Sequence, residues 1–205
     1  MEFIPDIILA MLKTVIGTIA IALTFLGYIP YIKDIIAGKT KPHLYSWISW
    51  SLVGAIVFAL QLSNNAGAGA FVTLAAELAC VVVIFLTIKY RVSSKITNTD
   101  KVFILLALIA LGFWLMAKQP VISAILLTLI DLLSFAPTVR KSWTYPYSET
   151  FFFYFLNILR FGLAVLSLSN YTTVNLFYPA TWFIANTLFV CMLFFRRRVN
   201  DIKIN

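Results

Sequence analysis

Seven stretches of about 20 mostly apolar residues fill almost the whole chain. A helix needs about 20 such residues to cross the ~30 Å hydrocarbon core of a bilayer, and it satisfies its own backbone polar groups on the way. Short polar or proline-containing segments separate the stretches, the tightest of them being Lys118-Gln119-Pro120. The sequence therefore predicts an all-α membrane protein whose seven transmembrane helices cover residues 8–33, 44–62, 68–88, 102–117, 120–139, 150–168 and 176–195.

The composition argues against a soluble domain and against several classes of function. Apolar residues make up 61% of the 205 residues and charged residues 12%, about half the charged fraction of soluble domains. Most of the basic residues behind the net charge of +8 lie beside or between apolar stretches, so we expect a lipid bilayer as partner and not nucleic acid. We find no nucleophile elbow, phosphate-binding glycine loop or metal-ligand cluster, and expect no enzyme activity, metal or cofactor. Cys80 and Cys191 lie inside apolar stretches as small packing residues.

Charge predicts the direction of the chain in the membrane. Thirteen of the 16 basic residues lie on the side of the first, third and fifth connections and of the C-terminus. The positive-inside rule assigns that side to the cytoplasm, with the N-terminus outside, and we favour a bacterial inner membrane. The basic residues on this side are Lys33, Lys39, Lys41, Lys89, Arg91, Lys95, Lys101, Arg140, Lys141, Arg196, Arg197, Arg198 and Lys203.

The chain contains an internal similarity with an offset of about 107 residues. Each copy has a small residue, an aromatic residue, one further residue and proline, followed two residues later by two charged residues. A short loop with proline and an aromatic-rich helix come next. The two segments are Leu26-Gly27-Tyr28-Ile29-Pro30-Tyr31-Ile32-Lys33-Asp34 and Leu133-Ser134-Phe135-Ala136-Pro137-Thr138-Val139-Arg140-Lys141. Three helices, a linking helix and three more helices would form two parallel three-helix repeats, a symmetry that transporters use.

This pattern resembles the PQ-loop superfamily, whose seven-helix members include the SWEET sugar transporters. The resemblance implies a first repeat over 1–88, a cytoplasmic loop and linker helix over 89–118, and a second repeat with a basic tail over 119–205. The chain departs from the namesake dipeptide, because Pro30 is followed by Tyr31 and Pro137 by Thr138. The resemblance also implies rocking of the repeats about a central site, with Pro30 and Pro137 as hinges. A static kink at each proline is the alternative.

Three ionisable residues lie deep in the predicted spans, where charged groups are costly and are candidates for function. Asp131 and Arg160 belong to adjacent helices and can form a structural ion pair or take part in transport. Glu77 has no evident basic partner at its depth. A carboxyl group that changes protonation as a cavity opens can couple transport to protons, so Glu77 is our candidate for that role.

Candidate substrate contacts are amide and aromatic side chains near the middle of the spans. Asn157 and Asn186 offer donors and an acceptor to a hydroxylated or zwitterionic ligand, and a hydrogen bond between helices is the alternative. The resemblance implies a substrate-binding asparagine in the third helix of each repeat, and Asn186 is close to that position. Trp50 and Trp182 are aromatic candidates, with core packing as the alternative for each. The resemblance implies a further aromatic contact late in the second helix of a repeat, and Phe58 is near that position.

These observations predict an alternating-access transporter of a small polar solute, either a sugar or an amino-acid-like zwitterion, with proton coupling left open. A membrane receptor or scaffold that binds a small ligand or peptide without flux is the alternative. The sequence leaves open the substrate, the direction of transport and the oligomeric state, a homo-oligomer included.

Overall fold

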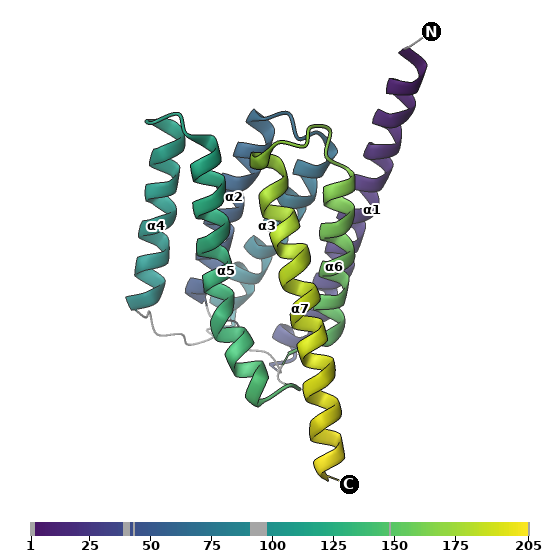
Figure 1. Ribbon diagram of the computed structural model, residues 1–205. Coiled ribbons are helices and arrows are strands. Elements are labelled where there is room, and N and C mark those ends of the chain that lie inside the picture. The colour runs from purple at the N-terminus through teal and green to yellow at the C-terminus, as the bar shows by residue number, and fades with distance from the viewer. Residues whose placement is uncertain (1–2, 39–41, 43, 91–97, 148, 205) are drawn as a thin grey trace.

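The computed structural model describes residues 3–38, 42, 44–90, 98–147 and 149–204. Within these residues the chain forms seven α-helices and no strand (Figure 1). His43 and the basic loop residues Lys39, Lys41, Arg91 and Lys95 lie outside the described residues. The helices are α1 (Phe3–Ile36), α2 (Leu44–Ser63), α3 (Ala68–Lys89), α4 (Asn98–Leu115), α5 (Pro120–Thr144), α6 (Phe151–Leu166) and α7 (Thr173–Ile204).

The helices have the composition of membrane spans. Four of them, α1, α3, α5 and α7, are long and apolar enough to cross a membrane. The apolar parts of the other three are shorter, at Trp47–Ser63, Ile104–Leu115 and Phe151–Leu166. With 16 residues, α6 is about 24 Å long at 1.5 Å per residue. Length and composition together indicate a membrane-embedded, all-helical protein.

The seven predicted segments are confirmed as helices, with differences at their ends. The break between α4 and α5 lies where the sequence predicts it: Lys118 has a φ of 53°, and Pro120 begins the next helix. Proline is favoured at a first helical position because the N–H it lacks would have no partner there. The last helix continues to Ile204, beyond the predicted end at residue 195, because polar and basic residues extend a helix outside the hydrocarbon region without cost in lipid.

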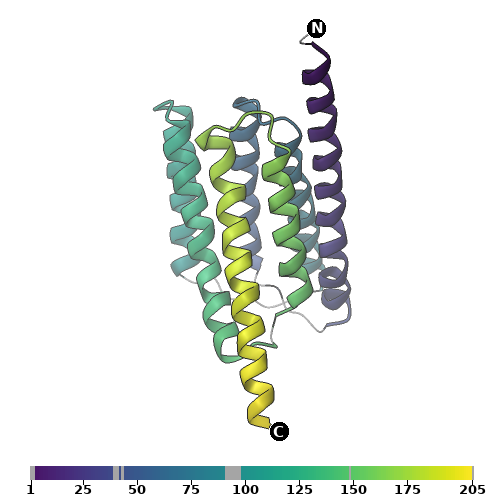
Figure 2. The same ribbon diagram turned by 45° about the vertical axis from the view of Figure 1, so that its right-hand side comes forward.

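Two groups of three helices can be defined by their contacts. In the first group α3 packs against both α1 and α2, and in the second group α7 packs against both α5 and α6. The groups meet through α1 with α6, α2 with α5, α3 with α6, and α2 with α7. The remaining helix, α4, packs on α5 and α2 at the edge of the bundle (Figures 1 and 2).

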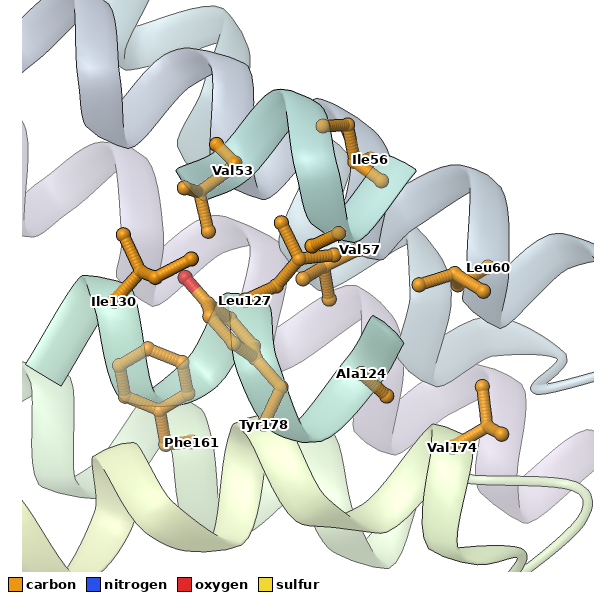
Figure 3. Packing of buried hydrophobic residues seen from close by; sticks show 12 residues of the cluster. Val53, Ile56, Val57, Leu60, Ala124, Leu127, Ile130, Phe161, Val174 and Tyr178 are labelled. Atoms are coloured by element: carbon orange, nitrogen blue, oxygen red, sulfur yellow. The ribbon is translucent and has the colours of Figure 1, made fainter. Parts of the chain in front are cut away.

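A hydrophobic cluster fills the junction between α2 and the second group. Val53, Val57 and Leu60 of α2 are at most 2% exposed and pack with Leu127 and Ile130 of α5. Figure 3 shows the cluster, with aromatic rings from α6 and α7 beside these aliphatic side chains. This cluster joins the two groups without any polar contact among its aliphatic members.

The two ends of the bundle hold different connections. Residues 63–67, 116–119 and 167–172 lie at the same end as the N-terminus, and the C-terminus lies at the opposite end (Figures 1 and 2). At the C-terminal end, α7 is tied to the last turn of α5 and to the segment between α5 and α6. Arg196 Nε donates to the Trp143 carbonyl (2.9 Å), and Arg197 donates to the carbonyls of Pro146 (3.0 Å) and Glu149 (2.8 Å).

Both predicted hinge prolines lie inside continuous helices. Pro30 is in α1, which runs on to Ile36, and Pro137 is in α5, which runs on to Thr144. A third proline, Pro179, lies inside α7 and was not among the predicted hinges. The helix bounds are compatible with a kink or a hinge at each position, so hinge motion stays a prediction.

The close approach of α1 to α3 gives a test of this packing. A Cβ added at Gly17 would lie 2.9 Å from Ala68 Cβ, whereas one added at Gly112 of α4 would meet nothing within 4 Å. We expect Gly17→Ala to destabilise the protein by about 1–3 kcal/mol through overpacking. Gly112→Ala should be neutral or stabilise it by up to about 1 kcal/mol through helix propensity. Thermal unfolding of the two variants in detergent would measure this, and equal melting temperatures would contradict the packing of α1 on α3.

Candidate functional site

Three ionisable side chains are buried in the middle of the bundle, each on a different helix. Asp131 of α5 is 3% exposed, Arg160 of α6 is 7% exposed and Glu77 of α3 is 8% exposed. Burial of a charge in apolar surroundings is costly unless polar partners replace water. The hydrogen-bond partners of each charged side chain therefore define what this part of the protein can do. We call Glu77, Asp131 and Arg160 the central charge cluster.

Asp131 is held by two donors from one face of α7. The Tyr178 hydroxyl and the Trp182 indole Nε1 both donate to Asp131 Oδ2, at 3.1 Å and 2.9 Å. These donors are four residues apart on α7 and so lie on the same side of that helix. The other oxygen, Asp131 Oδ1, is buried and has no hydrogen-bond partner. Asp131 therefore has one carboxyl oxygen held by α7 and one buried oxygen without a hydrogen bond.

Arg160 is oriented within its own helix. Its Nε donates to Asn157 Oδ1 at 2.7 Å, and its Cζ lies 4.1 Å from the centroid of the Phe161 ring. The described residues include no ion pair that joins Arg160 directly to either acid, but its charge acts on both Glu77 and Asp131. The direct pair of Asp131 and Arg160 considered from the sequence is therefore replaced by an interaction at longer range.

Glu77 lies against the backbone of α2. A Cβ added at Gly54 would overlap the Glu77 carboxyl group, so glycine is what allows this side chain to lie there. The Glu77 Oε2 atom is buried and has no hydrogen-bond partner. Glu77 of α3 and Asp131 of α5 lie on helices that both pack against α2, at the junction of the groups.

The charges in this cluster do not balance. Two carboxyl groups and one guanidinium group leave one negative charge in excess when all three are ionised. A single proton, or a single cationic group of a ligand, would neutralise the cluster. The two open carboxyl oxygens are the acceptors that such a proton or group would use.

The predicted substrate contacts fall into two sets. Asn157 and Trp182 contact members of the central charge cluster, and Asn186 is linked to it because its Nδ2 donates to the Trp182 carbonyl at 2.7 Å. The Trp182 ring is stacked on Phe161, with centroids 6.1 Å apart. Asn157 and Trp182 therefore form hydrogen bonds directly with members of the cluster, to Arg160 and Asp131. The hydrogen bond of Asn186 goes to Trp182.

The other two aromatic candidates lie elsewhere. Trp50 forms an edge contact with Trp47, with centroids 5.3 Å apart, and its Nε1 is buried without a partner. Phe58 contacts Phe71 and packs against the small cluster of Ala66, Ala70 and Leu168. The structure therefore brings Phe58 to the loops at the N-terminal end of the bundle and not to the central charge cluster.

Sequence reasoning missed two contributors to the site, Tyr178 and Gly54. Trp182 was predicted as a substrate contact, and the structure adds its hydrogen bond to Asp131. The spacing of Asn157 to Arg160 and of Tyr178 to Trp182 was the available signal, because residues three or four apart share a helix face. The approach of Glu77 to Gly54 had no such signal, since it depends on how α2 and α3 pack.

Comparisons of the chain with protein-family models, with curated proteins and with solved structures give no match.

The donors to Asp131 give a test of the site. Trp182→Phe keeps a ring of similar shape but removes one donor, so we expect a loss of about 1–3 kcal/mol of stability. The matched control is Trp114→Phe, because Trp114 packs against the same hydrophobic cluster and should lose less. In an Asp131→Ala background the cost of Trp182→Phe should largely disappear. Denaturant unfolding of the four variants would measure this, and an equal cost in both backgrounds would contradict the hydrogen bond.

Proposed function

We propose that this protein is an alternating-access membrane transporter of a small polar solute, with a PQ-loop and SWEET-like arrangement of three, one and three helices. The solute would be a sugar or an amino-acid-like compound. The central charge cluster carries the proposal. Three buried ionisable groups with two open carboxyl oxygens are costly in a protein that only has to fold, and they mark ligand or proton pathways in membrane proteins.

The helix contacts support two equivalent halves. If α1, α2 and α3 correspond to α5, α6 and α7, each contact of one half has a counterpart in the other. The contact of α1 with α6 corresponds to that of α5 with α2, and α3 with α6 corresponds to α7 with α2. Only α4 stands outside this pattern, as a linker helix would. Two such halves can rock about a site between them.

The location of the cluster fits this scheme. Glu77 belongs to the first group, whereas Asp131 and Arg160 belong to the second, so the excess charge is shared across the junction that would move. A proton or ligand that neutralises the cluster would favour the arrangement in which the acids lie closest together. We further propose that the N-terminus lies outside and the C-terminus in the cytoplasm, because Arg196, Arg197 and Arg198 extend from the C-terminal end of the bundle.

Reconstitution tests the proposal. Sugars and amino acids would first be screened by thermal shift on purified protein at two pH values. Each stabilising compound would then be tested, in radiolabelled form, for counterflow into proteoliposomes. We expect saturable uptake that is absent from liposomes without protein. Binding without any uptake would overturn the transporter and favour a receptor.

Glu77 gives a prediction on proton coupling. Glutamine cannot release or take up a proton at this position, so Glu77→Gln should make uptake insensitive to pH. Between two pH values about two units apart, we expect the ratio of uptake rates to fall to about one in the variant. Asp34→Asn of α1 is the control, because this half-buried acid lies outside the central charge cluster, and it should retain the dependence. Unchanged pH dependence in Glu77→Gln would remove this residue from the mechanism.

A further inference from the structure

The loops at the N-terminal end of the bundle are hydrogen-bonded across the two groups. The segment 63–67 joins α2 to α3, and the segment 167–172 joins α6 to α7. The backbone N–H of Ser169 donates to the carbonyl of Ala66 at 2.9 Å. A Cβ added at Gly67 would overlap the Ser169 side chain, so the two loops are also in close steric contact. We call these two loops and their hydrogen bonds the loop seal.

Asn175, in the first turn of α7, is the side chain that connects the loop seal most extensively. It is 0% exposed, and its Nδ2 donates to the carbonyls of Asn64 and Asn170, both at 2.9 Å. One amide group thus holds one carbonyl from each loop. Gln61 Nε2 donates to the Asn175 carbonyl at 3.3 Å and accepts at Oε1 from Thr73 Oγ1 at 2.8 Å. The network therefore includes α2, α3 and α7.

Lys13 of α1 adds a further bond between the groups. Its amine donates to the carbonyl of Leu168 at 2.6 Å and lies 4.9 Å from the centroid of the Tyr171 ring. This carbonyl lies just after the C-terminal end of α6. The last carbonyl groups of a helix have no partner within the helix, so they favour a nearby cation.

The contacts between the groups differ toward the C-terminal end. There Phe153 of α6 is stacked against Tyr31 of α1, with centroids 5.9 Å apart, and meets Tyr28 edge to face at 5.4 Å. Aromatic contacts permit sliding and tilting, because they have no single donor and acceptor to align. The hydrogen bonds of the loop seal lose their geometry when the loops separate by a few ångströms.

We propose that the loop seal is the outer gate of the transporter, closed in this structure, and that Asn175 is the positioning residue that keeps it closed. The inference rests on the proposed function, which places this end of the bundle on the outer side of the membrane. Opening this end would expose the junction of the groups to the outside. Separation of the loops breaks the Ser169 to Ala66 bond and both bonds of the Asn175 amide. A side chain that bridges both loops sets how often that separation occurs.

Hydrogen exchange tests the gate without a substrate. In the purified full-length protein we expect the Ser169 amide to exchange slowly. Asn175→Ala should speed its exchange by about tenfold or more, because two hydrogen bonds are lost. The matched control is Asn186→Ala on the same helix, since the bond of Asn186 Nδ2 to the Trp182 carbonyl lies within α7. It should leave the Ser169 amide unchanged.

A covalent link separates a positioning role from general loss of stability. In a background with Cys80→Ala and Cys191→Ser, the pair Ala66→Cys and Ser169→Cys would join the loops on oxidation. In the Asn175→Ala variant this disulfide should restore slow exchange in 167–172, and reductant should abolish the rescue. Equal exchange in wild type and Asn175→Ala, or no rescue in the oxidised pair, would overturn the proposal.

The same pair distinguishes failure of the gate from failure of the proposed function. For a solute that gives counterflow, oxidation should reduce uptake at least tenfold and reductant should restore it. Full uptake by the cross-linked protein would overturn the gate and leave the transporter standing. A different outcome is that the loops are protected in the wild type and open in Asn175→Ala, but the protein moves no solute. That result would overturn the transporter, while the closure by Asn175 would stand.

Discussion

The burial of charge inside an apolar bundle is the constraint on which the rest of this structure depends. Each of Glu77, Asp131 and Arg160 must find polar partners within the protein, because lipid offers none. Asp131 obtains them from α7 and Arg160 from its own helix, whereas Glu77 lies where Gly54 leaves room for its carboxyl group and its Oε2 has no hydrogen-bond partner. These requirements bring α2, α3, α5, α6 and α7 to one region. The packing of these helices and the placement of the buried charged groups therefore depend on each other.

Much of the fold follows from hydropathy alone. Apolar stretches of membrane-spanning length predict the helices, and short polar segments with proline or glycine predict where they end, as at Lys118 and Pro120. The helix ends are less predictable, because a polar segment such as Arg196 to Ile204 can continue a helix in water as readily as it can leave it. The pairing of helices needs information about side-chain packing that a periodic apolar pattern does not contain.

The site was partly predictable. Glu77, Asp131 and Arg160 were predicted as functional candidates from their depth in the spans. The free-energy cost of burying a charge there is independent of the details of packing. Their partners depend on which helix faces lie together, and so Tyr178 and Gly54 were missed. Asn175 was missed for another reason. It lies near the end of a predicted span, where an asparagine is unremarkable until the two loops that it bridges are seen together.

The long last helix has a mechanical consequence. With 32 residues, α7 is about 48 Å long, and its final turns project beyond the other helices (Figures 1 and 2). Arg196 and Arg197 fasten it to the segment between α5 and α6, so the projecting part belongs to one half of the molecule. A small tilt of that half would therefore displace the C-terminus by a larger distance than the rest of α7. A fluorophore or binding protein attached there would report the relative motion of the halves that the proposed function requires.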